Sequence, residues 1–185
     1  SPPVSRGAVV TGKLLGVFGS IALSTLIGFS AAGALIVSSQ GTDGLARYAA
    51  FVLLSLFLSL AFLSLALLIA TMVHRKARAF GVALFAWFFF VLLYDLLALG
   101  GTLLLRGEMA NIALFLSLFG NPVDMVRVAS LIILDNVTIF GAAGAALVRF
   151  LGGGAWSVAL LVAGLGAWIL LPLIVAQRLL RHPDI

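Results

Sequence analysis

Residues 48–73 read YAAFVLLSLFLSLAFLSLALLIATMV, a run of 26 residues without a single charged side chain. A helix needs roughly 20 consecutive apolar residues to cross the hydrocarbon core of a bilayer. In the whole chain only 9% of residues are charged and 63% are hydrophobic, with a mean hydropathy of +1.27. A soluble domain averages about 25% charged residues. The sequence therefore predicts an all-α integral membrane protein.

Three further runs have the same character. Residues 14–37 and 155–177 carry no charge, and residues 80–105 carry only one, Asp95. Each run is long enough to cross a bilayer as a helix. We therefore expect four transmembrane helices in a single transmembrane domain that covers residues 1–185.

The segment at residues 107–154 does not fit the pattern of a simple span. Its first apolar stretch is too short to cross a bilayer, and a predicted helix start follows it. There Asn121 can cap the helix, Pro122 suits the first helical position, and Asp124 suits the first turn. The segment is either a fifth span or two short helices that dip into the membrane and return, broken near Asp135.

The distribution of Lys and Arg separates these alternatives. With the N-terminus in the cytosol and four spans, seven basic residues lie inside and four outside, whereas a fifth span gives six and five. The positive-inside rule favours the first arrangement. We therefore expect a polytopic helical bundle with four spans and an external re-entrant helical hairpin, whose turn contains Asn121, Pro122, Asp124 and Arg127. The inside residues are Arg6, Lys13, Arg75, Lys76, Arg78, Arg178 and Arg181, and the outside residues are Arg47, Arg106, Arg127 and Arg149.

The sequence offers little to an enzyme. Residues 7–13 match the phosphate-binding loop G-x-x-x-x-G-K, but Leu14 stands where that loop needs Ser or Thr, and a span follows it. The chain has no Cys, and its two His residues lack metal-ligand spacing. We expect no catalytic, cofactor-binding or metal-binding residues in this chain and no nucleic-acid partner. Arg6 and Lys13 instead anchor a helix end at the lipid headgroups.

Small side chains recur at every fourth position along the first span. This spacing lets two helix backbones approach closely in lipid. The stripe could pack within one chain or against a second copy, and the sequence favours neither. Its members are Gly12, Gly16, Ser20, Ser24, Gly28 and Ala32.

Asp95 is the only ionisable residue deep within a predicted span. A charge at such a depth costs at least ~2.5–3.5 kcal/mol, so we expect Asp95 to face other helices or a cavity. A proton relay usually has several acids or a His partner at membrane depth. We therefore favour a structural role, in which Asp95 fixes helix packing through Tyr94 or a serine of a neighbouring span.

Several short motifs resemble one family. The opening SPPVSRGAVVTGKLLG, residues 1–16, is similar to the cytosolic loop and following span of type-2 ABC transporter permeases, where a P-x-S-R element precedes a G-K. Tyr94-Asp95-Leu96-Leu97, GNPVDMVR at 120–127 and QRLLRH at 177–182 resemble one branch of that family. This branch comprises the permeases of the system that matures nitrous oxide reductase.

The resemblance implies a fold, partners and a location. The four spans would be the third to sixth of a six-span permease of the type-2 ABC exporter kind, in the bacterial inner membrane. A second permease copy and cytosolic ATPase subunits would join it, and ATP and Mg would bind in those subunits. Ser5, Arg6 and Lys13 would lie beside the ATPase. A periplasmic accessory protein would meet the outer mouth, and the system would serve copper–sulfur cluster maturation.

Two other functions stay open at this point. The chain could belong to a type-2 ABC permease for another cargo, such as a lipid, a drug or a polysaccharide. It could also be a membrane scaffold or a proton-linked carrier that works without an ATPase.

Overall fold

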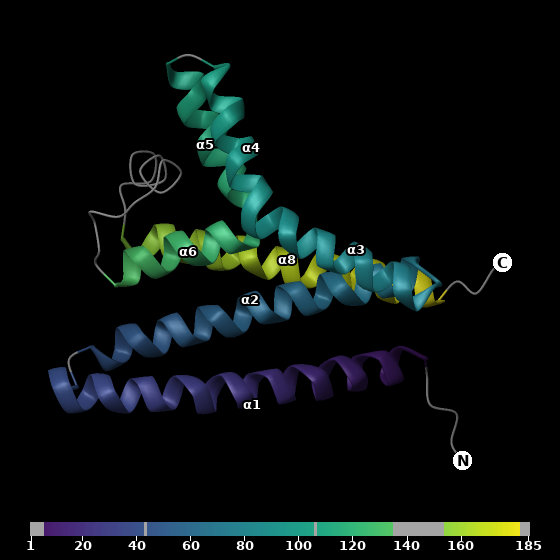
Figure 1. The fold of residues 1–185 in the computed structure, drawn as a ribbon, viewed down its shortest axis with the longest axis horizontal. Helices are drawn as coiled ribbons and strands as arrows, with labels where there is room; N and C mark the ends of the chain where they lie inside the picture. Colours follow the sequence, from purple (N-terminus) through teal and green to yellow (C-terminus); the bar gives the residue numbers. More distant parts are fainter. Residues whose placement is uncertain (1–5, 43, 106, 135–153, 182–185) are drawn as a thin grey trace.

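A computed structural model describes residues 6–42, 44–105, 107–134 and 154–181, and every regular element in these ranges is a helix (Figure 1). The all-α prediction is confirmed. The elements are α1 (Arg6–Gln40), α2 (Leu45–Met72), α3 (Lys76–Phe88), a π-helical turn (Phe89–Leu93), α4 (Tyr94–Leu103), α5 (Glu108–Phe119), α6 (Pro122–Ile133) and α8 (Ala155–Arg181).

Among the residues that the structure describes, four helices are long and apolar enough to cross a membrane, and the bent pair at 108–133 would make a fifth if it counts as one span. The start of α1, the link from α2 to α3 and the end of α8 lie at one end of the bundle (Figure 1). The helices extend a few residues beyond the uncharged runs, because polar end residues can continue a helix into the headgroup layer. The candidate spans are Val10–Ser39, Leu45–Met72, Lys76–Gly101 and Ala155–Leu180.

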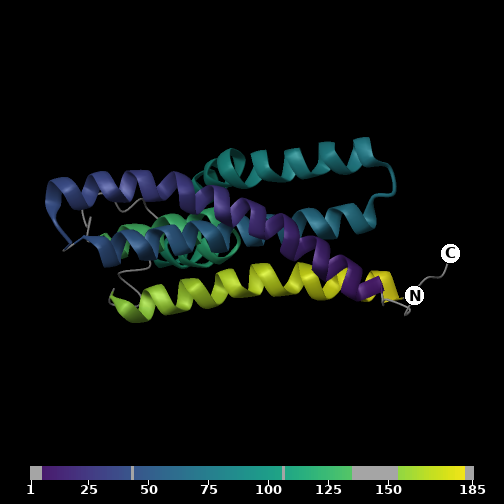
Figure 2. The same cartoon turned by 90° about the horizontal axis from the view of Figure 1, so that it is seen from below.

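The tightly packed core lies between α2, α6 and α8. Fully buried apolar residues come from all three helices: Ala61 from α2, Met125 and Ala129 from α6, and Leu161 and Leu165 from α8. By contrast α1 packs mainly along α2 and keeps most of its surface exposed (Figure 2). A short helix from the segment at 107–154 is thus more central to the bundle than the first long helix.

The third long helix is interrupted, which the sequence did not predict. The π-helical turn Phe89–Leu93 separates α3 from α4, and α4 then leaves the bundle to pair with α5 (Figure 1). A π-helical turn places one extra residue in a helical turn and often marks a functional site. The place beside α2 that a straight helix would fill is taken by α6.

The segment at 107–154 bends where the turn of the hairpin was expected, at Asn121. Its two described helices, α5 and α6, meet at 102° across Gly120 and Asn121. The predicted break near Asp135 lies outside the described residues. The predicted helix start is confirmed: Asn121 caps α6, its side chain accepting from Val123 N, with Pro122 in the first turn. A bend of this size is typical of a broken span or a re-entrant loop.

The small-residue stripe of α1 makes no close helix contact with the described residues. A Cβ added at Gly12, Gly16 or Gly28 would meet no atom within 4 Å. The close approach of α1 to α2 is instead at Gly33, where an added Cβ would stand 3.0 Å from Tyr48 Cε1. Packing of the stripe against a second copy stays a prediction.

Candidate functional site

Polar side chains gather where the interrupted third helix meets the bend between α5 and α6. We call this set the polar junction, and it contains the side chains of Tyr94, Asp95, Asn121, Asp124 and Arg127 and the backbone carbonyls of Phe90 and Ser117. Phe90 and Trp168, both bonded to the bend, lie near the middle of Lys76–Gly101 and of α8. The bend therefore sits at mid-span, where lipid offers no hydrogen-bonding partner.

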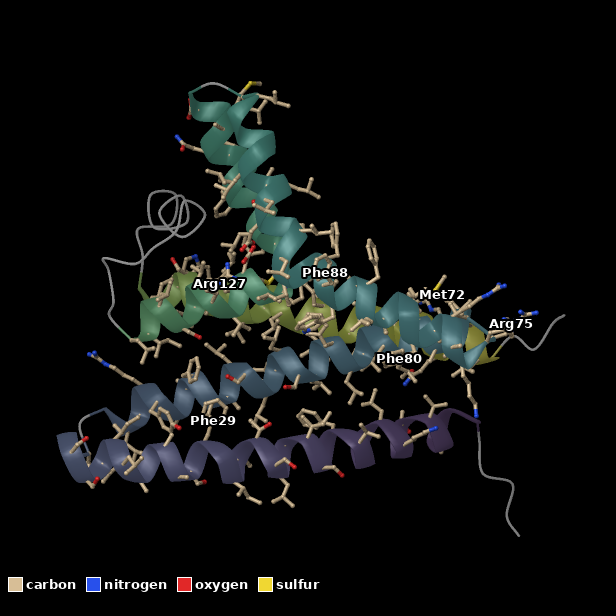
Figure 3. The ribbon with its side chains drawn as sticks, viewed as in Figure 1. Phe29, Met72, Arg75, Phe80, Phe88 and Arg127 are labelled. Atoms are coloured by element: carbon tan, nitrogen blue, oxygen red, sulfur yellow. The ribbon has the colours of Figure 1, made fainter. Side chains whose placement is uncertain are left out.

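Arg127 of α6 links the two acidic residues of the junction. Its Nη1 lies 2.7 Å from Asp95 Oδ2 and 3.0 Å from Asp124 Oδ1. One guanidinium thus faces two carboxylates, so the three side chains carry a net charge of −1 when all are ionised. Arg127 lies close to the point where α4 leaves the bundle (Figure 3). This ion pair ties α4 to α6.

Asn121 is completely buried, and its side-chain amide both accepts and donates hydrogen bonds. Its Oδ1 accepts from Val123 N at 3.0 Å, while its Nδ2 donates to Phe90 O at 2.9 Å and to Asp124 Oδ2 at 3.0 Å. A cap residue with only an acceptor could not make the last two bonds. Asn121 therefore caps α6 and also holds the π-helical turn against it.

Tyr94 makes a second connection between the third helix and the bend. Its hydroxyl donates to Ser117 O at 2.6 Å. The hydroxyl lies so close to Gly120 that a Cβ at this position would collide with it and would also stand 3.2 Å from Ser117 O. The absence of a side chain at Gly120 is thus required for the tyrosine to reach its partner.

The bend also packs closely against α8. Trp168 Nε1 donates to Phe119 O at 3.0 Å, which satisfies a carbonyl at the end of α5. A Cβ added at Gly164 would stand 3.1 Å from Met125 Sδ and 3.2 Å from Phe119 Cδ1. The indole thus satisfies an exposed backbone group at mid-span, and the glycine makes room for the bend.

The arrangement is suited to holding helices together rather than to bond chemistry. Each polar group named above has a partner, and the two described residues with unpaired buried hydroxyls, Ser130 and Ser157, lie elsewhere on α6 and α8. Among the residues that the structure describes, no three of His, Cys, Asp and Glu lie close enough to hold a metal ion. The junction couples the middle of one span to the bent segment.

The sequence identified several of these residues but mistook the partner of Asp95. It expected Asp95 to bond Tyr94 or a serine, and the structure pairs it with Arg127, 32 residues further along. It also counted a single acid at this depth, whereas Asp124 shares the same guanidinium. Acidic residues in spans often pair with a cation, and the four outside arginines were the candidates that the sequence offered. Nothing in the sequence marked Phe90, Ser117 or Trp168.

Two of the three residues expected to contact an ATPase lie in the first turns of α1. Arg6 begins the helix, Lys13 is exposed about two turns later, and Ser5 lies outside the described residues. Their proposed role stays a prediction.

The described residues define a multi-pass helical membrane protein with a re-entrant or broken segment. They contain four helices able to cross a membrane, the third of them interrupted, and a bent helix pair held at mid-span. Comparison with known protein families agrees with this class. The model of the ABC-2 family transporter protein matches residues 1–184. The chain therefore belongs to the ABC-2 family of transporter permeases, and by this membership it is a transport subunit rather than an enzyme.

Two relatives align with the greater part of the chain. The ABC transporter permease protein NosY of Pseudomonas aeruginosa is 38% identical over 133 residues, which cover 70% of this chain and 48% of the relative. The NosY protein of Stutzerimonas stutzeri is 35% identical over 133 residues, with the same shares of each chain. The chain thus spans about half the length of the curated relatives it matches. The resemblance to this family noted from the sequence is confirmed.

Proposed function

We propose that this chain is part of the permease subunit of an ATP-driven transporter that supports copper–sulfur cluster maturation of nitrous oxide reductase. The main support is that 70% of its length aligns with two NosY permeases at 38% and 35% sequence identity. The subunit would work in the bacterial inner membrane with a cytosolic NosF-like ATPase, in which ATP and Mg bind. A NosD-like periplasmic protein would meet its outer mouth.

The polar junction suggests how such a subunit could transmit movement. The α3 helix starts at the same end of the bundle as α1, where α8 also ends. It leads directly into the π-helical turn. The turn is bonded to Asn121, so a shift of α3 would move the bend and α6 with it. ATP-driven movement at the cytosolic end would in this way reach the outer half of the bundle.

A second permease copy is the proposed neighbour of the junction. The side chains of Arg127 and Asp95 are 49% and 31% exposed in the single chain. An ion pair at this depth is costly if it faces lipid. We infer that a second copy, or a water-filled space between two copies, covers this side of the junction. The expectation that Asp95 does not face lipid depends on this proposed cover.

The first prediction concerns the path of the bent segment. Residues 1–185 contain no Cys, so a single cysteine placed at Glu108, Ala155 or Lys76 can be labelled selectively. A membrane-impermeant thiol reagent added to intact spheroplasts should label Glu108→Cys and Ala155→Cys but not Lys76→Cys, because a re-entrant segment returns to the side it left. If Ala155→Cys reacts only after the membrane is opened, as Lys76→Cys should, the segment crosses fully.

The second prediction tests coupling to the ATPase. Reversing the charge with Arg6→Glu should leave insertion intact and yet greatly reduce nitrous oxide reductase maturation per ATP hydrolysed, because the proposed contact of Arg6 with the ATPase would turn repulsive. Arg6→Lys, which keeps the charge, is the matched control and should retain most maturation.

The measurements are ATPase activity of the purified complex and copper content of the reductase from the same cells. Normal maturation by Arg6→Glu with normal ATPase binding would remove Arg6 from the coupling surface. Failure of the wild-type gene to restore maturation in a strain lacking it, despite a bound ATPase, would instead point to another cargo.

A further inference from the structure

One cation stands directly before the uncharged run of α1, and another stands directly after the uncharged run of α8. Lys13 directly precedes the run at 14–37, and Arg178 directly follows the run at 155–177. Both side chains are exposed. Because apolar residues fill the hydrocarbon core, the first cation beyond each run lies at the level of the lipid phosphates. The two cations therefore share one depth, at the end of the bundle where α1 starts and α8 ends.

The same end of the bundle contains an apolar cleft. There α1 crosses α8 beside the last turns of α2 (Figure 2), and the helices enclose a volume of about 220 Å³. Its walls include Val10, Leu14, Leu67 and Leu173, while Thr11 and Gln177 add polar groups. The cleft thus has the lining expected for a hydrocarbon chain, with an amide near one side.

Each cation is the sequence neighbour of a residue that lines the cleft, so its long side chain starts within one residue of the cleft wall. Lys13 adjoins Leu14, a residue of the cleft wall, and Arg178 adjoins Gln177, another. The acidic side chains that the structure describes belong instead to α4, α5 and α6. Among the described residues this end of the bundle is therefore positive without acidic compensation, and basic clefts between helices on the cytosolic side are suited to anionic headgroups.

We propose that this cleft is a binding site for one anionic phospholipid of the inner leaflet. One acyl chain lies between α1 and α8 against Leu14 and Leu173. The lipid phosphate lies between Lys13 and Arg178, and the Gln177 amide donates to the headgroup or ester oxygens. Lys13 then meets a lipid phosphate rather than the ATPase surface. The site is independent of the cargo that the transporter carries.

Lipid retention by the full-length protein tests the proposal. The complex is purified, exchanged into a mixture with equal amounts of phosphatidylglycerol and phosphatidylcholine, and examined by native mass spectrometry. The wild type should retain one phosphatidylglycerol at least several-fold more often than phosphatidylcholine. Lys13→Gln/Arg178→Gln should lose this preference, whereas Arg75→Gln/Lys76→Gln, which removes the same charge from the α2–α3 link, should keep it.

A third variant tests the acyl-chain part of the site. Leu14→Trp fills the cleft without changing the charge and should reduce retention as strongly as the loss of both cations. The proposal is overturned if the wild type has no preference, if both double variants lose retention equally, or if Leu14→Trp retains the lipid. An excess of soluble glycerol phosphate should not displace the lipid, and displacement would show a headgroup site without an acyl-chain cleft.

Discussion

The substitution Arg127→Leu is expected to abolish most activity and to destabilise the bundle more than any change at Asp95. It removes the guanidinium that lies within 3.0 Å of both Asp95 and Asp124, so two carboxylates would be left close together without a cation. Breaking a buried ion pair in this way costs about 3–5 kcal/mol. We expect the lower part of this range, because the pair is partly exposed in the single chain.

Changes at Asp95 should follow a different order. Asp95→Asn leaves one carboxylate for one guanidinium, which brings the net charge of the set from −1 to zero, and its carbonyl can still accept from Arg127. The weaker hydrogen bond should cost about 1 kcal/mol. Asp95→Leu removes the connection between α4 and α6 and should cost more than Asp95→Asn but less than Arg127→Leu.

Thermal unfolding of the purified protein, together with reductase maturation in cells, would measure this order. The double variant Asp95→Leu/Arg127→Leu serves as the control, because it removes the pair and should recover part of the stability lost by Arg127→Leu alone. If Asp95→Asn abolishes maturation in a protein that inserts and assembles normally, the charge of Asp95 itself is needed and the structural role is wrong.

A second large effect is expected at Asn121. Asn121→Leu would leave Phe90 O and Val123 N without their partners in a site that water does not reach. The lost cap costs about 0.5–2 kcal/mol, and each buried group left unsatisfied costs about 1–3 kcal/mol. We therefore expect a loss of roughly 2–4 kcal/mol and a bend that no longer stays attached to the third helix.

Two smaller substitutions separate the roles of this side chain. Asn121→Ser can still cap α6 but is too short to reach Phe90 O, so it should lose the contact to the third helix alone. Asn121→Asp can cap as well, yet it places a carboxylate beside Asp124 and should be worse than serine. Near-normal stability of Asn121→Leu would mean that the bend is held by Tyr94 and Trp168 instead.

Local signals in the sequence predicted the local structure well. The long uncharged runs indicated four long helices, because only a helix satisfies its own backbone in lipid. The helix start at Asn121 and Pro122 followed from capping rules that act over a few residues. The family was likewise recognisable from short motifs that lie in order along the chain.

Contacts between distant residues were harder to predict. The π-helical turn lies within an unbroken apolar run, Phe89–Leu93, that has no Gly or Pro to mark an interruption. The interruption depends on Asn121, 31 residues away from Phe90, and on α6 filling the space beside α2. The pairing of Asp95 with Arg127 depends on the same packing of α6 against the third helix, which short-range patterns in the sequence do not reveal.

The separation of Asp95 and Arg127 along the chain also has a consequence in time. Protein synthesis adds about 5–20 residues per second. Since Arg127 follows Asp95 by 32 residues, it is made roughly 2 to 6 seconds later. During that interval the third helix must enter the membrane with an uncompensated acid, and α6 is not yet present to hold it. The third helix can therefore enter straight and acquire its bend only after α6 has been made, so its final shape is set later than its insertion.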